Sequence, residues 1–214
     1  MNYGLLFRTV RHLKPTQVFH QVKYRLVKPA YKTYETSGFK IQDSSFKTEP
    51  IVKPRCLKGE DFTFLNLAHT FSGWYYTENG MLWAYNQNYF DWLNQEGAST
   101  SSATEGCRWI DRFISDVKGG FPMDPYPIAL RSINWVKFFS KYPEMATKER
   151  VDALYSQIKL LEKKLEYHLL GNHLLEDAYA LYFVSSYFKF QVLCRGKATG
   201  GRASGFKKVR KLLL

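Results

Sequence analysis

The stretch Leu165-Glu-Tyr-His-Leu-Leu-Gly-Asn-His-Leu-Leu-Glu176 joins two helical patterns at a Gly-Asn break. Before the break, apolar residues recur at steps of three and four throughout residues 147–170, and similar spacing resumes in residues 172–190. A Gly that ends one helix and an Asn that caps the next are a common pairing at helix junctions. The stretch therefore predicts two long helices that meet at a sharp turn.

The same stretch gathers four polar side chains where a solvated helix would show Lys and Glu: His168, Asn172, His173 and Glu176. An amide beside an imidazole at a helix junction can form a pocket for an anionic, oxygen-rich ligand. A purely structural role as an N-cap explains Asn172 but leaves the two histidines unexplained. We therefore take this junction as the main candidate binding site.

Two further helices are predicted upstream, over residues 105–118 and 126–141, because each pattern places its apolar side chains on one face. The short links at residues 119–124 and 142–144 favour antiparallel helical hairpins. Hairpins in series indicate a mainly α fold, either a solenoid or a closed toroid.

The first half of the chain has weaker patterns. Residues 7–31 carry apolar residues near helical spacing, interrupted by Pro15 and Pro29, which predicts a short helix followed by a longer one. Residues 32–82 contain Pro and Gly breaks and predict only short strands or coil. Residues 97–105 are rich in small and polar residues and predict an exposed loop.

The 214-residue chain is long enough to bury a sizeable core, and 45% of its residues are hydrophobic. It contains no run of about 18 apolar residues that would span a membrane, and its first residues lack the features of a secretory signal. Cys56, Cys107 and Cys194 are scattered, which fits reduced thiols. These features favour a cytoplasmic protein and leave the periplasm open.

The net charge of +12 is concentrated at the two ends of the chain. Residues 1–34 and residues 191–214 each contain seven basic residues and no acidic one, so residues 35–190 hold 17 basic and 19 acidic residues, a net charge of −2. This divides the chain into a basic N-terminal helical segment, a nearly neutral domain and a basic tail. The neutral domain argues against nucleic-acid binding. The N-terminal segment favours contact with an anionic membrane surface or glycan.

One cluster with possible chemistry lies at residues 83–93, where aromatic rings alternate with amides. Its candidate ligand-binding residues are Trp83, Asn86, Asn88 and Tyr89. Rings stack on the apolar faces of sugars, and amides bond sugar hydroxyl groups. The alternative is that the rings anchor the core and the amides stabilise turns.

A second cluster opens the helix predicted at residues 126–141, with Tyr126, Arg131, Asn134 and Trp135 as candidates. Arg131 and Asn134 are three residues apart and share a helical face, which places them to clasp a carboxylate. The alternative is a structural ion pair for Arg131 and a helix-to-loop bond for Asn134.

The chain contains no His-Glu-x-x-His motif, no paired-cysteine metal pattern and no phosphate-binding loop with the required spacing. We therefore predict neither a metal nor another cofactor.

The strings Tyr85–Leu93, Pro125–Trp135 and His168–Glu176, in this order and at this spacing, resemble the N-terminal half of the heparinase II/III and alginate-lyase-like polysaccharide lyases. The resemblance covers roughly residues 1–190. It implies an incomplete α/α toroid of antiparallel helical hairpins. In the family a β-sandwich domain follows the toroid, and we do not expect that domain in this chain. The family cleaves uronic-acid-containing polysaccharides by β-elimination.

The resemblance also implies roles for individual residues. Asn172 matches the family's carboxylate-neutralising Asn and His173 matches the His beside it, while Asp177 stands where the family has Asn. The family's catalytic Tyr and a further His follow later in its sequence, but residues 191–214 do not resemble the family and suggest a shifted reading frame.

We therefore expect a truncated lyase-like domain that is inactive alone and whose partner is an acidic polysaccharide. A non-catalytic anionic-glycan-binding module, or an accessory module of polysaccharide biosynthesis, is the alternative. A functional basic tail is the alternative to a shifted frame.

Overall fold

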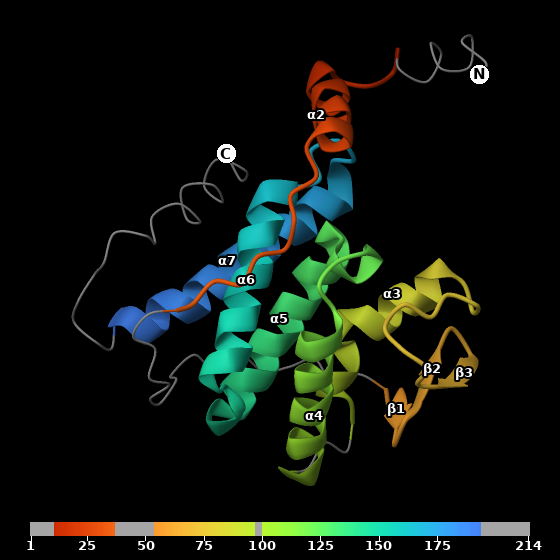
Figure 1. The fold of residues 1–214 in the computed structure, drawn as a ribbon, viewed down its shortest axis with the longest axis vertical. Helices are drawn as coiled ribbons and strands as arrows, with labels where there is room; N and C mark the ends of the chain where they lie inside the picture. Colours follow the sequence, from red (N-terminus) through yellow and green to blue (C-terminus); the bar gives the residue numbers. More distant parts are fainter. Residues whose placement is uncertain (1–10, 37–53, 97–99, 194–214) are drawn as a thin grey trace.

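The fold is taken from a computed structural model, which describes residues 11–36, 54–96 and 100–193 (Figure 1). These residues form a mainly helical structure with one small sheet, so the predicted mainly α class is confirmed. The helices are α2 (Pro15–Leu26), α3 (Met81–Tyr89), α4 (Thr100–Asp116), α5 (Pro125–Lys141), α6 (Lys148–Lys164) and α7 (Gly171–Leu193). Three short 3-10 helices are η1 (Asp91–Asn94), η2 (Phe121–Met123) and η3 (Pro143–Met145).

Helix α5 lies at the centre of the helical layer and packs against α3, α6 and α7 (Figure 1). It begins with Pro125 in its first turn, where a missing N–H costs nothing, and its bounds agree with the predicted helix within one residue. The short η3 link returns the chain into α6, so α5 and α6 form an antiparallel hairpin.

Helix α4 begins at Thr100, so the predicted exposed loop at residues 97–105 is helical over its second half. Small side chains explain the difference, because they let α4 approach its neighbours closely. A Cβ at Gly106 would meet Leu93 at 3.0 Å and Phe138 at 3.1 Å, and Ala103 is buried. Ala103 and Gly106 are thus packing positions on α4.

Helix α6 ends at Lys164, six residues before the predicted end, and the chain then turns through residues 165–170. Leu165 is extended, and the N–H of Leu170 bonds the carbonyl of Glu166 to close the turn. Leu170 and Gly171 both have φ of +60°, which reverses the chain into α7.

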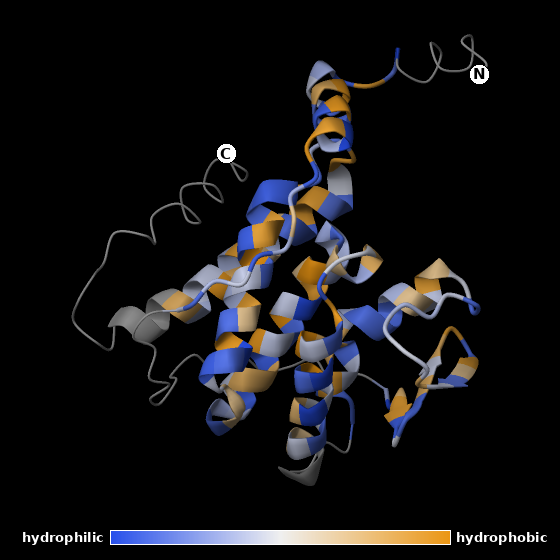
Figure 2. Cartoon of the chain, viewed as in Figure 1, coloured by the Kyte–Doolittle hydropathy of each residue, from blue (hydrophilic) through white to orange (hydrophobic). Residues whose placement is uncertain are grey.

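A three-stranded antiparallel sheet of β1 (Leu57–Lys58), β2 (Asp61–Phe64) and β3 (Leu67–Thr70) precedes α3. In its register Phe62 pairs with Leu57 on one side and His69 on the other. The Phe62 ring is fully buried and meets Trp92 and Trp109 edge-on, so the sheet closes one side of an aromatic core. Figure 2 shows apolar and polar residues alternating along the helices that enclose this core.

Helix α2 stands at one end of the molecule, and the chain after it runs along α6 (Figure 1). Two side chains of α6 hold this strap. Ser156 accepts a hydrogen bond from the Tyr34 N–H at 2.8 Å, and Asp152 accepts one from the Thr36 N–H at 2.7 Å. Among the described residues, none of the helices has the length and apolar character needed to cross a bilayer. The basic tail proposed from residue 191 lies outside the described residues beyond Leu193.

Candidate functional site

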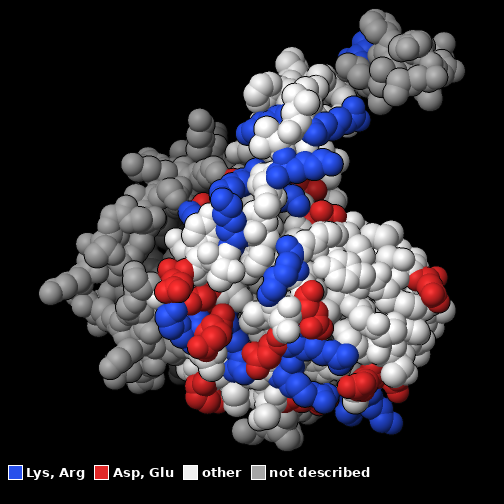
Figure 3. Space-filling model, viewed as in Figure 1, with Lys and Arg blue, Asp and Glu red and all other residues white. Residues whose placement is uncertain are grey.

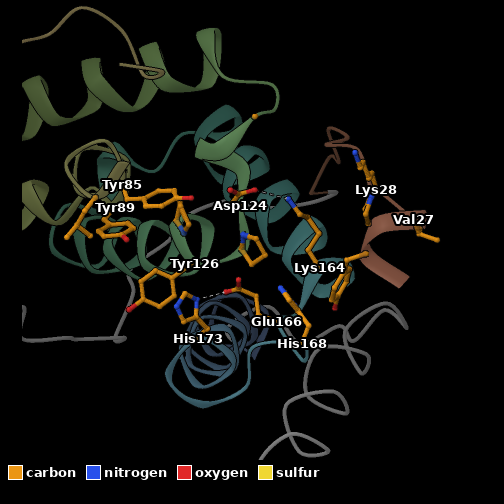
Figure 4. A pocket seen from close by; sticks show the side chains of 16 residues that line it. Val27, Lys28, Tyr85, Tyr89, Asp124, Tyr126, Lys164, Glu166, His168 and His173 are labelled. Carbon is orange, nitrogen blue, oxygen red and sulfur yellow. Dashed lines mark hydrogen bonds and ion pairs between the residues drawn. The ribbon is translucent and has the colours of Figure 1, made fainter. Parts of the chain in front are cut away.

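A cavity of about 810 Å³ opens where α2, α3, α5 and α6 meet the turn before α7 (Figure 4). Its lining combines four phenols, two imidazoles, two lysines and two carboxylates. The lining residues are Tyr24, Val27, Lys28, Pro29, Leu82, Tyr85, Tyr89, Gly120, Asp124, Pro125, Tyr126, Pro127, Lys164, Glu166, His168 and His173. The predicted junction around residues 165–173 therefore forms one wall of a real cavity.

Three tyrosines and one histidine form a continuous aromatic row in this cavity. Tyr85 and Tyr89 are one turn apart on α3 and lie parallel, with ring centroids 6.3 Å apart. Tyr126 meets Tyr89 edge-on at 5.8 Å and lies 4.5 Å from His173. Burial is the main cause that raises the pKa of Tyr85, Tyr89 and Tyr126. The three phenols therefore stay protonated at neutral pH and can donate hydrogen bonds.

Glu166 orients the His173 ring. Its carboxylate lies 3.0 Å from His173 Nδ1, and Figure 4 shows the two side chains pointing toward one another. Glu166 is itself positioned by Asp177, which accepts a hydrogen bond from the Glu166 N–H at 2.8 Å. The contact between Glu166 and His173 occupies Nδ1 of the imidazole. Nε2 is therefore the ring nitrogen that remains for a ligand.

Lys164 and Asp124 form an ion pair across the cavity from His173. Their charged atoms are 3.5 Å apart, and Lys164 Nζ also donates to the Met123 carbonyl at 2.9 Å. Lys28 lines the cavity next to the end of α2, on the side of Lys164 that faces away from His173 (Figure 4). The cavity therefore offers cations for an anionic ligand and carboxylates for its hydroxyl groups.

Four of the twelve predicted site residues line the cavity: Tyr89, Tyr126, His168 and His173. The His168 ring packs edge-on against Tyr24 with centroids 5.2 Å apart. Asn172 is exposed in the first turn of α7, beside His173 but outside the lining, and Glu176 follows one turn later, half-buried.

The expected role of Arg131 in an open cleft is wrong, because this side chain has no exposed surface. Its Nε donates to Gln157 Oε1 at 2.6 Å, and its terminal nitrogens donate to the carbonyls of Asn88 and Pro122 at 2.9 and 3.0 Å. The guanidinium also lies over the Phe113 ring. Each donor thus holds a segment of the fold, and burial lowers the pKa of Arg131 to about 9.

The other candidates in the two upstream clusters also have structural roles. Trp83 and Trp135 are fully buried, and Trp83 Nε1 donates to the Leu67 carbonyl at 2.9 Å. Asn88 is buried and donates to the Trp74 carbonyl at 3.1 Å. Asn134 Nδ2 donates to the Tyr89 carbonyl at 3.0 Å, and Asn86 Nδ2 donates to the Leu82 carbonyl within α3. The interpretation that these rings anchor the core and these amides stabilise turns is the one that fits.

Several cavity residues are not among those predicted from the sequence, most clearly Tyr24, Lys28, Tyr85, Lys164 and Glu166. One signal was available, since Tyr85 and Tyr89 are four residues apart and share a helical face. The others come from segments that only the fold brings together.

No group of three or more His, Cys, Asp or Glu side chains among the described residues is arranged to hold a metal ion. Comparison with protein-family models, curated proteins and solved structures finds no match to this chain.

Proposed function

We propose that the cavity binds uronate units of an acidic polysaccharide, as the substrate-holding part of a polysaccharide-lyase-like protein. In this proposal α4–α7 are hairpins of an incomplete α/α toroid. The observation that carries the binding role is the row Tyr85, Tyr89 and Tyr126 beside Lys164. The eliminating role rests on the resemblance of the three sequence strings.

The aromatic row suits a sugar ring. A pyranose has apolar C–H faces that stack on aromatic rings, and its hydroxyl groups need hydrogen-bond partners at the edge. The tyrosine side chains supply both the stacking surface and the hydrogen-bond partner, because each combines an aromatic ring with a hydroxyl donor. Asp124 and Glu166 add acceptors that a neutral apolar ligand would leave unused.

The charged groups favour a sugar with a carboxylate over a neutral one. Lys164 and Lys28 line the cavity, and Lys164 is partly buried, with 23% of its side chain exposed. A partly desolvated ammonium interacts more strongly with an anion than a solvated one. A uronate carboxylate near Lys164 would compete with Asp124 for the same cation.

The same neutralisation is what β-elimination requires. Removal of the proton at C5 builds negative charge on the carboxyl group, and a positioned donor there stabilises the transition state. In the proposal Lys164 stabilises that charge, while the proton transfers belong to the Tyr and the His that the resemblance places later in the family's sequence. Asn172 is exposed on the first turn of α7, so its amide would contact the sugar chain outside the cavity.

Isothermal titration calorimetry with charged and neutral oligosaccharides tests the binding role. We expect oligosaccharides from alginate or heparin to bind and a neutral glucan of equal length to bind at least about tenfold more weakly. Tyr126→Ala and Lys164→Gln should each weaken binding about tenfold or more.

The matched controls are Tyr179→Ala and Lys141→Gln, which alter an exposed tyrosine and an exposed lysine outside the cavity lining. Both should bind like the unaltered chain, and circular dichroism checks that all four variants are folded. Equal binding of neutral and charged oligosaccharides, or unchanged binding by the two cavity variants, would overturn the proposal.

A further inference from the structure

Helix α2 attaches to the rest of the protein through a polar and aromatic face. Gln17 Nε2 donates to the His168 carbonyl at 3.3 Å, and the Tyr24 hydroxyl donates to the Leu165 carbonyl. The His20 ring stacks on Tyr167 with centroids 4.6 Å apart. Positions 17, 20 and 24 are spaced by three and four, so they form one face of the helix.

The opposite face of α2 is apolar and points outward. Phe19, Val22 and Leu26 follow the same spacing of three and four and are 64%, 51% and 79% exposed. Val27, which follows the last residue of the helix, is 54% exposed. None of the residues of α2 is buried. The helix therefore has inverted polarity for a globular protein, with its polar face inward and its apolar face in water.

Basic side chains flank this apolar face. Lys23 and Arg25 lie on α2, Lys14 precedes it as the N-cap and Lys28 follows it, while residues 11–34 contain no acidic residue. Figure 3 shows Lys and Arg side chains along α2 and the chain below it, on the end of the molecule that stands away from the body. An exposed apolar stripe bordered by lysine and arginine is the pattern of a helix that lies in a membrane interface.

We propose that α2 binds the surface of a bilayer that contains anionic lipids. Phe19, Val22 and Leu26 enter the boundary between headgroups and acyl chains, and the flanking cations contact the headgroup phosphates. The helix has 12 residues, which gives a length of about 18 Å, so it lies along the surface and does not cross the bilayer.

Two other occupants explain the surface less well. An acidic polysaccharide would satisfy the cations but would leave the apolar stripe in water. A second copy of the chain would cover the stripe but would bring two clusters of like charge together without an acidic residue between them. A bilayer with anionic headgroups above apolar acyl chains matches both the flanking cations and the apolar stripe.

This inference goes beyond the proposed function and does not depend on it. The two are linked in space, because Tyr24, Val27 and Lys28 at the end of α2 also line the cavity. A protein bound through α2 would therefore hold the cavity close to the membrane surface.

Co-sedimentation with lipid vesicles tests the proposal. One set of vesicles contains phosphatidylcholine alone, and the other contains equal parts of phosphatidylcholine and phosphatidylglycerol. We expect binding to the anionic vesicles that falls as salt is raised, and at least about tenfold weaker binding to phosphatidylcholine. Phe19→Ser/Leu26→Ser and Lys23→Glu/Arg25→Glu should each reduce binding to anionic vesicles about tenfold or more.

Matched double variants elsewhere on the surface serve as controls. Leu65→Ser/Leu67→Ser removes two exposed leucines at the turn between β2 and β3, and Lys58→Glu/Lys141→Glu reverses two exposed lysines. Both should bind vesicles like the unaltered chain and should also bind oligosaccharide normally, as should Phe19→Ser/Leu26→Ser.

Three outcomes would overturn the proposal. One is no binding of the unaltered chain to anionic vesicles. Another is a loss of vesicle binding in the control variants as large as that in the α2 variants. The third is a dimer in size-exclusion chromatography that Phe19→Ser/Leu26→Ser dissociates while vesicle binding stays unchanged, which would assign the stripe to a second copy.

Discussion

Asp177 in the second turn of α7 accepts a hydrogen bond at 2.8 Å from the backbone N–H of Glu166, which lies in the turn before that helix. The bond joins positions eleven residues apart and keeps residues 165–170 out of α6. It also leaves the Glu166 carboxylate 3.0 Å from His173. One buried carboxyl group thus sets the geometry of one wall of the cavity.

Asp177→Asn should stabilise the protein. Burial is the largest cause that raises the pKa of the Asp177 carboxyl from 3.8 to about 8, and the hydrogen bond from Glu166 opposes it only in part. The pKa of Asp177 is higher in the folded protein than in the unfolded chain. The free energy of unfolding therefore decreases as pH rises from 3.8 to about 8. Asn keeps the acceptor oxygen and does not ionise in either the folded or the unfolded state. We expect a gain of about 2 kcal/mol in the free energy of unfolding at pH 7.

Urea denaturation at pH 4 and pH 7 measures this gain, which should nearly vanish at pH 4. The control is Glu78→Gln, an exposed carboxyl group on the surface, which should leave stability unchanged at both pH values. A gain of equal size at pH 4 would show that the charge on Asp177 is not its source.

Arg131→Ala should destabilise the protein by about 3 to 5 kcal/mol, since it removes a buried side chain and leaves the acceptors on Asn88, Pro122 and Gln157 unsatisfied. Arg131→Lys should also destabilise it, because a single ammonium cannot reach three acceptors that lie in different directions. Chemical denaturation measures both losses, with the exposed Arg108→Ala as the control. Unchanged stability together with lost oligosaccharide binding would restore a ligand-binding role for Arg131.

Asp152→Ala should weaken the attachment of the strap at residues 27–36. Burial alone would raise the pKa of Asp152, but hydrogen bonds from Lys148 and Thr36 outweigh it and lower the pKa. Because the folded pKa lies below the unfolded one, this contribution is present at neutral pH and is lost as pH falls below about 4.

We expect Asp152→Ala to lower the free energy of unfolding by about 1 to 2 kcal/mol at pH 7 and by less at pH 3. Limited proteolysis should cut the strap faster in this variant than in the unaltered chain at pH 7. Equal losses of stability at the two pH values would refute the assignment to the ionised carboxylate.

The 214-residue chain should bind uronate polysaccharides without cleaving them, because the resemblance assigns catalysis to a Tyr and a His later in the family's sequence. The ultraviolet absorbance of the unsaturated uronate product measures elimination directly. A rise that His173→Ala abolishes and Tyr179→Ala preserves would contradict this expectation and would make His173 the base and Tyr126 the proton donor to the leaving oxygen.

The sequence by itself determined where the longest helices of the second half of the chain lie, but it did not predict α3 (Met81–Tyr89). Helix periodicity is local, so α5 and α7 could be placed within a few residues, and the junction between residues 165 and 173 could be marked as a binding wall. The positive charge of the first 34 residues also follows from the sequence, because it depends only on their composition.

Only the tertiary structure decided which polar residues line the cavity. Arg131 and Tyr126 belong to the same predicted cluster on α5, yet Arg131 is held by carbonyls from other segments while Tyr126 lines the cavity. Periodicity shows which side chains share a face but not what that face meets. For the same reason the apolar stripe of α2 reads as a core face, but in the fold Gln17 and Tyr24 bond the body and turn that stripe outward.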